Sequence, residues 1–165
     1  AFQATNIAAA MALADWLEIN PEEAAAAINS YVPNNNRAEW RTTERNRVLL
    51  DAYNANPSST LASLQAFAQL PNAENPLVVL GDMFELGEWA AGEHQAMLDW
   101  VHNHAPHWSV WTVGPLYAAC PRPAKRSFAT TEEALNELNT AALKGATVLI
   151  KGSRGMALEQ LLPAL

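Results

Sequence analysis

The chain has 165 residues, 50% of them hydrophobic, and a formal net charge of −7. This length suits one domain, or one domain with a piece of another. The acidic balance argues against nucleic acid as the main partner, because basic patches bind phosphate backbones. No apolar run reaches the roughly 18 to 20 residues that a membrane-spanning helix needs. A single cysteine, Cys120, excludes an internal disulfide framework and fits a reducing compartment such as the cytoplasm.

The first part of the chain predicts two helices. Apolar residues at helical spacing predict a helix over residues 5–18. Asn20 and Pro21 have the side chains of a helix cap and a first helical position, so a second helix is expected over 21–32. The sequence opens as AFQATN, without Met or a signal peptide, in the middle of a helical pattern. We therefore expect the chain to be a fragment of a longer protein.

A polar stretch without periodicity, PNNNRAEWR at 33–41, follows these helices. We interpret it as a linker with a domain boundary near Asn36. Two helices cannot form a domain alone, so residues 1–35 are expected to be the end of a preceding domain. Residues 36–165 are then a second domain.

Strand and helix patterns alternate after the linker. Two continuously apolar strands, Leu77–Leu80 and Thr147–Ile150, are typical of a parallel sheet covered on both faces. The alternation predicts right-handed βαβ units and a three-layer, Rossmann-like α/β domain with a mostly parallel sheet. Strands are expected at 47–53, 76–83, 109–114, 126–130 and 147–153, and helices at 57–70, 89–104, 131–143 and 155–165.

Ligands of open α/β sheets bind outside the carboxyl ends of the strands, so the residues after each strand matter most. The first strand is followed by Asp51, Tyr53, Asn54 and Asn56. Asn56 precedes Pro57 and is expected to cap the next helix. Capping does not explain Asp51, which can accept ribose hydroxyls, or Tyr53, which offers a flat face to a base.

Acidic residues follow the second strand in the motif GDMFELGE, namely Asp82, Glu85 and Glu88. They are either site residues or a solvated loop favoured by a helix N-terminus. The last strand leads into KGSRGM, with Lys151, Ser153 and Arg154. Two cations, a hydroxyl and a helix start together suit an anion. The alternative is that Ser153 caps a helix and both cations are solvated.

Some common nucleotide and metal motifs are missing from the sequence. The P-loop spacing G-x-x-x-x-G-K-[ST] does not occur, and no Gly-rich dinucleotide fingerprint follows the first strand. His102 and His104 stand at i and i+2, on different faces of a helix, and no Cys or His has ligand spacing to them. No metal site is therefore expected in this chain.

Three motifs carry a specific resemblance. LLDAYNANPSST, VVLGDMFELGE followed by His94, and VLIKGSRGMALEQLL resemble, in this order and spacing, the C-terminal domain of the Mur ligase family. The likeness covers residues 36–165. The segment FQATNIAAAMALA resembles the last helices of the family's central ATPase domain, which fits the assignment of residues 1–35 to that domain.

The resemblance implies an ATP-dependent ligase of three domains. ATP phosphorylates the carboxylate of a UDP-muramoyl peptide, and an amine attacks the acyl phosphate to form an amide. The motifs resemble most the member that adds D-Ala-D-Ala to UDP-N-acetylmuramoyl-tripeptide during peptidoglycan precursor synthesis. The P-loop and the Mg²⁺ ligands are expected in the central domain, outside this chain, so we expect the chain alone to be inactive and to hold no catalytic residue.

The resemblance also implies roles for single residues on the nucleotide side. Asn6 matches the second asparagine of a pair that contacts adenine, whereas Gln3 replaces the first. Arg37 matches a linker arginine that reaches the ATP phosphates. Asp51 matches the ribose-binding acid, and Tyr53 and Asn54 line the same turn.

On the acceptor side, Lys151, Ser153 and Arg154 match the group that faces the incoming amino acid. Asp82 and Glu85 are candidates to bind the dipeptide ammonium or to orient these basic residues.

Two other functions stay open at this point. One is a related ATP-dependent ligase with another amino acceptor, such as folylpolyglutamate synthetase. The other is a non-catalytic binding module of Rossmann type. A P-loop encoded upstream would favour the ligases.

Overall fold

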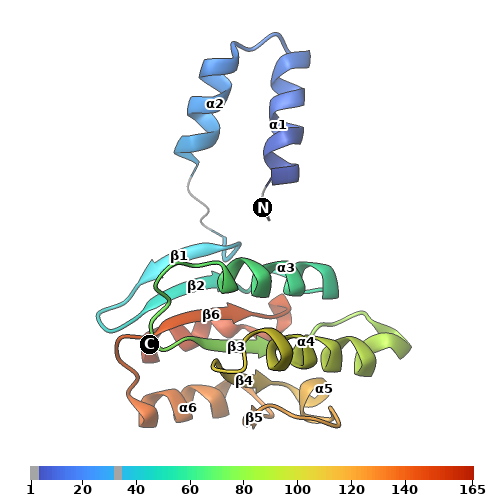
Figure 1. Cartoon of the computed structure of the whole chain (residues 1–165), viewed down its shortest axis with the longest axis vertical. Coiled ribbons are helices and arrows are strands. Elements are labelled where there is room, and N and C mark those ends of the chain that lie inside the picture. The colour runs from blue at the N-terminus through green and yellow to red at the C-terminus, as the bar shows by residue number, and fades with distance from the viewer. Residues whose placement is uncertain (1–3, 32–34) are drawn as a thin grey trace. The chain divides into compact units, whose positions relative to one another are not determined.

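The structure is a computed structural model that describes residues 4–31 and 35–165. The chain divides into two compact units, which we call the helical unit (residues 1–33) and the sheet unit (residues 34–165) (Figure 1). Among the described residues, no helix combines the length and the apolar character needed to cross a membrane.

The helical unit contains α1 (Ala4–Trp16) and α2 (Pro21–Ser30), which pack side by side (Figure 1). Both predicted helices are confirmed. Asn20 caps α2, because its side-chain oxygen accepts a hydrogen bond from the backbone N–H of Glu22 at 2.8 Å. The side chains buried here are small, Ala14 and Ala24. Larger apolar side chains are exposed instead: Ile7, Leu13, Trp16, Leu17 and Ile19.

The sheet unit follows the predicted alternation of strands and helices. Its elements, in chain order, are β1 (Glu39–Thr42), β2 (Arg47–Asp51), α3 (Pro57–Ala68), β3 (Leu77–Gly81), the 3₁₀ turn η1 (Gly87–Trp89), α4 (Ala90–His104), β4 (Ser109–Val113), α5 (Pro115–Ala118), β5 (Arg126–Phe128), α6 (Thr131–Ala141), β6 (Thr147–Lys151), and the 3₁₀ segments η2 (Arg154–Met156) and η3 (Leu158–Ala164).

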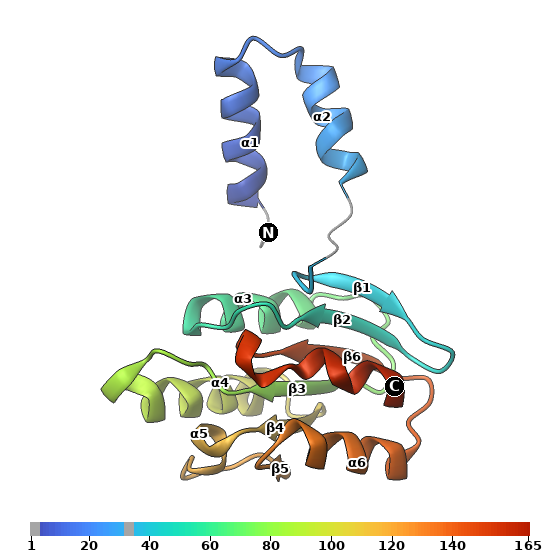
Figure 2. The same ribbon diagram turned by 180° about the vertical axis from the view of Figure 1, so that it is seen from behind.

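The six strands form one sheet in the order β1-β2-β6-β3-β4-β5 (Figures 1 and 2). All neighbouring strands are parallel except β1, which pairs antiparallel to β2. The predicted mostly parallel sheet is therefore confirmed. Because β6 lies between β2 and β3, the carboxyl ends of these three strands meet at one edge. Asp51 and Lys151, the last residues of β2 and β6, are direct partners in the register.

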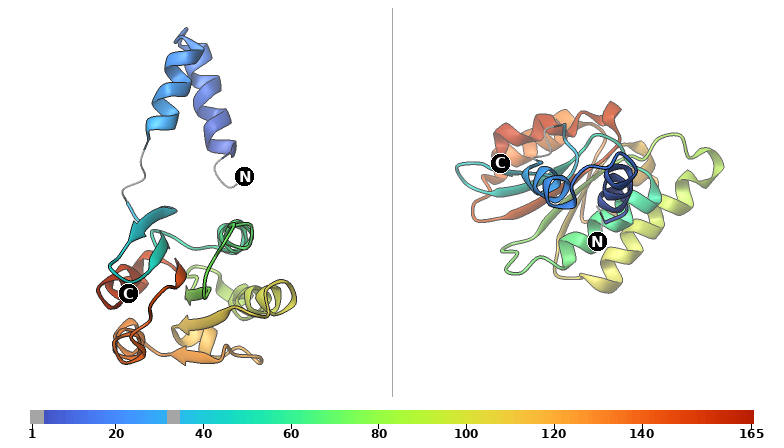
Figure 3. Two further views of the ribbon diagram at one scale, coloured as in Figure 1. Left: turned by 60° about the vertical axis from the view of Figure 1, so that its left-hand side comes forward. Right: turned by 90° about the horizontal axis from the view of Figure 1, so that it is seen from above.

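Helices cover both faces of this sheet, as Figure 3 shows from the side. On one face, α6 and η3 pack on a core that includes Val48, Leu50, Val148 and Ile150. On the other face, α3, α4 and α5 pack on the alternate strand residues, among them Leu49 and Leu149. Successive residues of a strand point to opposite faces, so a strand between two helical layers must be apolar throughout. The three-layer α/β prediction is confirmed.

The expected linker at 33–41 is wrong in part, because β1 begins at Glu39 within it. The strand is four residues long, and its side chains are exposed apart from Glu39. Such a short, polar sequence carries little strand signal by itself. It forms a strand because it pairs with the buried β2. The prolines after β4 likewise conceal a short helix, α5.

The expected α-helix at 155–165 is also wrong, since 3₁₀ segments occupy this stretch. Ala157, between them, has a left-handed backbone with φ of 50°, which interrupts any regular helix. Pro163 removes a further backbone N–H donor inside η3. The carbonyl of Met156 instead accepts a hydrogen bond from the Thr131 hydroxyl at 2.6 Å.

Candidate functional site

A buried ion pair lies where β2 and β6 end. The Lys151 Nζ is 3.0 Å from Asp51 Oδ2, and the two side chains are only 2% and 7% exposed. The same ammonium donates a hydrogen bond to the backbone carbonyl of Asn54 at 2.5 Å. Burial lowers the pKa of Lys151, while its ion pair and hydrogen bond with Asp51 oppose that shift. The strand ends therefore hold a matched charge pair rather than two charges that face solvent.

The Asp51 carboxylate joins several segments of the sheet unit. Its Oδ2 also accepts a hydrogen bond from the Ser63 hydroxyl of α3 at 2.6 Å. Its Oδ1 accepts from the backbone N–H of Ala38 at 3.2 Å. An ionised carboxylate has about four acceptor positions, so three donors leave about one for a further hydroxyl. Ser63 was not among the predicted site residues, although it lies on the buried stripe of α3 with Thr60 and Leu64.

The turn after Asp51 is built largely by its asparagines. Asn56 caps α3 through a reciprocal pair of hydrogen bonds with Ser59, and Pro57 takes the first helical position, as predicted. Asn54 is exposed, and its side-chain oxygen accepts a hydrogen bond from the next backbone N–H, that of Ala55, at 2.9 Å. We call residues 51–56 the strand-end turn.

Two arginines meet the aromatic ring of this turn. The Arg37 guanidinium carbon lies 4.0 Å from the centre of the Tyr53 ring, and that of Arg154 lies 5.4 Å from it. Both arginines are exposed, and the tyrosine is half-buried. The backbone N–H of Tyr53 also donates to the carbonyl of Asn36 at 3.1 Å. The fold thus brings three predicted site residues together from three distant segments, with two cations open to solvent.

Ser153, which follows β6, connects to the loop between β3 and η1 (residues 82–86), which we call the acidic loop. Its hydroxyl oxygen accepts a hydrogen bond from the backbone N–H of Phe84 at 3.0 Å. Its own backbone N–H donates to the carbonyl of Asp82 at 3.2 Å. The alternative that Ser153 caps a helix is wrong, because its side chain makes no cap bond to η2. The three-residue η2 also replaces the expected helix start, so any anion site here depends on side chains rather than a helix dipole.

The structure gives Asp82 a different place from the predicted one. Its side chain is fully buried, and its two oxygens accept hydrogen bonds from the backbone N–H groups of Leu116 and Tyr117, both at 3.0 Å. Asp82 thus caps the short α5. Gly114 has φ of +117°, and a Cβ there would lie 2.3 Å from the Asp82 carboxyl carbon. Because this carboxylate is enclosed, we correct the expectation that it meets a dipeptide.

Glu85 remains available for a ligand in this structure. It is exposed, on a left-handed backbone with φ of 64° in the loop between β3 and η1. Glu88, three residues later, is exposed as well.

His94, on α4, contacts the acidic loop through a hydrogen bond. It is fully buried, and its Nε2 accepts a hydrogen bond from the Met83 backbone N–H at 2.9 Å. Its Nδ1 lies 2.6 Å from the Ala90 carbonyl and donates to it, which assigns a neutral imidazole. Its ring also packs in a T-shaped arrangement against the ring of Tyr117, with the ring centres 4.5 Å apart. Over residues 4–31 and 35–165, no three Asp, Glu, His or Cys side chains gather in a way that could hold a metal.

The helical unit carries one predicted site residue, Asn6, which is exposed on α1. Gln3, which takes the place of the other asparagine, lies outside the described residues.

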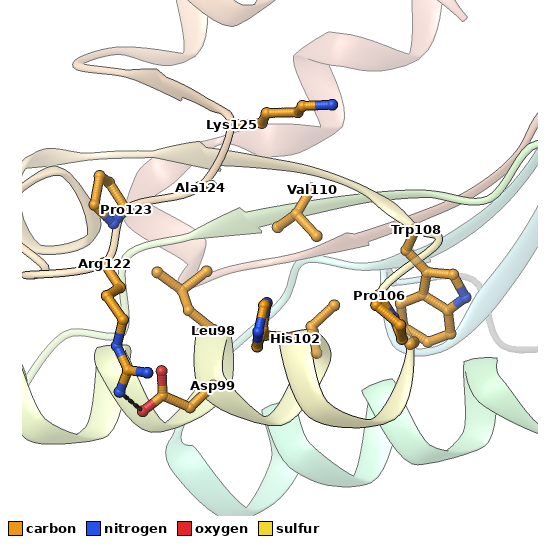
Figure 4. A pocket seen from close by; sticks show the side chains of 12 residues that line it. Leu98, Asp99, His102, Pro106, Trp108, Val110, Arg122, Pro123, Ala124 and Lys125 are labelled. Carbon is orange, nitrogen blue, oxygen red and sulfur yellow. Dashed lines mark hydrogen bonds and ion pairs between the residues drawn. The ribbon is translucent and has the colours of Figure 1, made fainter.

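A pocket of about 220 Å³ lies elsewhere in the sheet unit, between α4, the start of β4 and the loop before β5 (Figure 4). Apolar side chains such as Leu98 and Trp108 line it, and an ion pair of 2.9 Å between Arg122 and Asp99 closes one side. No predicted site residue lines this pocket. The predicted site residues gather instead around the strand-end turn, where Arg37, Asn54 and Arg154 are exposed, and this region is the candidate site.

Comparisons with known proteins agree on one family. The sequence model of the family described as "Mur ligase, glutamate ligase domain" matches residues 36–154. The UDP-N-acetylmuramoyl-tripeptide–D-alanyl-D-alanine ligase of Bacillus subtilis (strain 168) is 31% identical, over 94% of this chain and 36% of that protein. The ligase of the same name from Treponema pallidum (strain Nichols) is 40% identical, over 71% of this chain and 27% of that protein. The chain thus spans 27% to 36% of the length of these relatives.

Solved structures give the same result for the fold. A crystal structure of MurF from Acinetobacter baumannii superposes with a TM-score of 0.79 at 27% identity, covering 96% of this chain and 36% of that one. MurF from Thermotoga maritima in complex with ADP superposes with a TM-score of 0.74 at 24% identity, covering 98% of this chain and 37% of that one.

Proposed function

Because the chain belongs to the Mur ligase family, we propose that it is the C-terminal part of an ATP-dependent amide ligase. The reaction we propose adds D-Ala-D-Ala to UDP-N-acetylmuramoyl-tripeptide in peptidoglycan precursor synthesis, in the cytoplasm. The relatives carry the name of this reaction. The observation that carries the proposal is the cluster of Arg37, Tyr53 and Arg154 at the strand ends.

Residues 1–35 are proposed to be the last helices of the central ATPase domain, and residues 36–165 the C-terminal domain. The exposed apolar residues of α1 and α2 support this division, since a helix pair of this kind needs a further surface to bury them. The P-loop and the Mg²⁺ ligands belong, in this proposal, to the part of the ligase that precedes the chain.

The nucleotide side of the site in the sheet unit is proposed to consist of Arg37, Asp51, Tyr53 and Asn54. Asn6, on the helical unit, is proposed separately as an adenine contact. Arg37 is exposed and fixed to an aromatic ring, so its remaining donors can meet phosphate oxygens. Asp51 has acceptor capacity for about one ribose hydroxyl beyond its three present donors. Asn54 is exposed on the same turn and can donate through its amide.

The acceptor side is proposed to centre on Arg154. D-Ala-D-Ala has a free carboxylate, and an arginine can bind it with two parallel hydrogen bonds. Ser153 is only 4% exposed. Its hydroxyl oxygen accepts a hydrogen bond from the Phe84 N–H, so its proton remains for a carboxylate that Arg154 draws close. Glu85 is exposed and directly follows Phe84, whose backbone N–H donates to the Ser153 hydroxyl, so it is a candidate for the dipeptide ammonium.

In the proposed reaction, the tripeptide carboxylate takes the γ-phosphoryl group of ATP, with release of ADP. The dipeptide amine then attacks the acyl phosphate, and the amide forms with loss of a proton and inorganic phosphate. The residues of this chain contribute binding and orientation to that reaction. Two exposed guanidinium groups can hold phosphate and carboxylate anions that approach one another.

The test is a kinetic comparison in the complete ligase. Arg154→Ala should raise the KM for D-Ala-D-Ala strongly, with the KM for ATP nearly unchanged, because it removes a charge-assisted contact worth roughly 1.5 to 3 kcal/mol. The matched control is Arg122→Ala, another exposed arginine, which lies at the separate pocket. Ligation of glutamate in place of D-Ala-D-Ala by the wild-type enzyme would instead favour a ligase of the folylpolyglutamate type.

A further inference from the structure

The surroundings of Lys151 do not fit a residue that grips a substrate carboxylate. Its side chain is 2% exposed, and its ammonium already contacts the Asp51 carboxylate at 3.0 Å and the Asn54 carbonyl at 2.5 Å. A dipeptide carboxylate would have to displace these partners from a buried place. Arg154, three residues on, is exposed and needs no such exchange.

The two partners of Lys151 belong to one short segment. Asp51 and Asn54 lie at the start and in the middle of the strand-end turn, with Tyr53 between them. The ammonium therefore bridges the turn that presents the tyrosine ring to the two arginines. It comes from β6, next to β2 in the sheet, so a rigid strand holds it in place.

Asp51 extends this bridge toward Arg37. Its Oδ1 accepts from the backbone N–H of Ala38, the residue directly after Arg37. Among the described residues, Lys151 is the only ion-pair partner of Asp51. Loss of the ammonium would leave a buried carboxylate without a counter-charge, and the turn would have to rearrange to hydrate it.

We propose that Lys151 is a positioning residue that holds the strand-end turn in the shape that binds the nucleotide, and that it is not a ligand of the dipeptide. This inference rests on the proposed function, because its kinetic test measures the KM for ATP and for D-Ala-D-Ala. The lowered pKa that burial gives Lys151 agrees with an ammonium removed from water.

The experiment compares two lysine variants in the complete ligase. Lys151→Met keeps an unbranched side chain, one heavy atom shorter, and removes the charge. It should raise the KM for ATP about tenfold, the equivalent of one charged contact, and change the KM for D-Ala-D-Ala less than about threefold. Lys144→Met, at an exposed lysine before β6, is the matched control and should change neither value. A rise confined to the KM for D-Ala-D-Ala would overturn the proposal.

A second variant covers the case in which Lys151→Met does not fold. Ser63→Ala removes another donor to Asp51 Oδ2, with almost no change in volume. If the turn acts through Asp51, this variant should also raise the KM for ATP, about threefold or more, and leave the dipeptide KM unchanged. An unchanged KM for ATP in Ser63→Ala would contradict the proposal.

A measurement on the 165-residue chain separates this inference from the proposed function. Nitrogen-15 NMR of the lysine side chains should show one ammonium signal protected from exchange with water. That signal should vanish in Lys151→Met, persist in Lys144→Met and stay in place when D-Ala-D-Ala is added. Absence of a protected signal refutes the buried bridge. A protected signal in a ligase that does not use D-Ala-D-Ala refutes the proposed substrate and leaves the bridge intact.

Discussion

Replacing Asp51 by alanine is expected to destabilise the sheet unit far more than the loss of an exposed ion pair would. The substitution removes the counter-charge of Lys151 and leaves its ammonium with the Asn54 carbonyl alone among the contacts described above. It also removes the acceptor for the Ala38 N–H. Ser63 loses less, because its hydroxyl already donates to the Ser59 carbonyl at 2.9 Å as well.

The size of the effect follows from the burial of the pair. Removal of one partner of a buried ion pair costs about 3 to 5 kcal/mol, whereas an exposed pair contributes about 0 to 1 kcal/mol. Domains are stable by only about 5 to 15 kcal/mol in total, so Asp51→Ala should remove a large share of that. At about 3 °C per kcal/mol, the melting temperature should fall by roughly 10 to 15 °C.

The assay is urea unfolding of the 165-residue chain, followed by circular dichroism, for the wild type, Asp51→Ala, Lys151→Met and the double variant. The double variant removes both charges, so it should lose less free energy of unfolding than the sum of the single variants. A cost below about 1 kcal/mol for Asp51→Ala, with additive behaviour in the double variant, would refute a buried, coupled pair.

Three further outcomes are expected. The chain alone should not turn over ATP with D-Ala-D-Ala, because its sequence holds no P-loop to position the γ-phosphate; phosphate release by the purified chain would contradict this. In the complete ligase, Arg37→Ala should raise the KM for ATP about tenfold or more, through loss of a charged contact, and an unchanged nucleotide KM would exclude the phosphate role. Burial, with smaller effects of Cys120 and Asp82, raises the pKa of Tyr117 above its usual 10.0, so the unfolded chain ionises first. The stability that comes from its protonated hydroxyl is thus complete below pH 10 and falls as the pH rises beyond it, and urea unfolding on both sides of pH 10 should show a smaller fall in Tyr117→Phe.

The central strands could be predicted because their signal is local. The runs that form β3 and β6 are apolar throughout, and a sheet covered on both faces requires that. β1 could not be predicted in the same way, since EWRT becomes a strand only through its pairing with β2. The helix predicted at the end of the chain was wrong for a related reason. The apolar residues there have helical spacing, but Ala157 adopts a left-handed backbone among them.

The position of the candidate site could be predicted from the sequence, but the contacts between its side chains could not. The rule that ligands lie at the carboxyl ends of strands indicates the region around Asp51 and Lys151. It does not indicate that the two side chains pair with each other, because that depends on the insertion of β6 between β2 and β3. Asp82 shows the same limit. Its enclosure depends on α5, which begins more than thirty residues later in the chain.

The two outer strands of the sheet have a consequence for how this protein meets other chains. β1 and β5 are four and three residues long, and charged side chains such as Arg41 and Arg126 stand on them. Short, charged outer strands are poor templates for the backbone of a second molecule, so they resist the edge-to-edge pairing that leads to aggregation. Every open sheet leaves unpaired N–H and C=O groups along its outer strands, and here those strands are short, so few such groups are exposed.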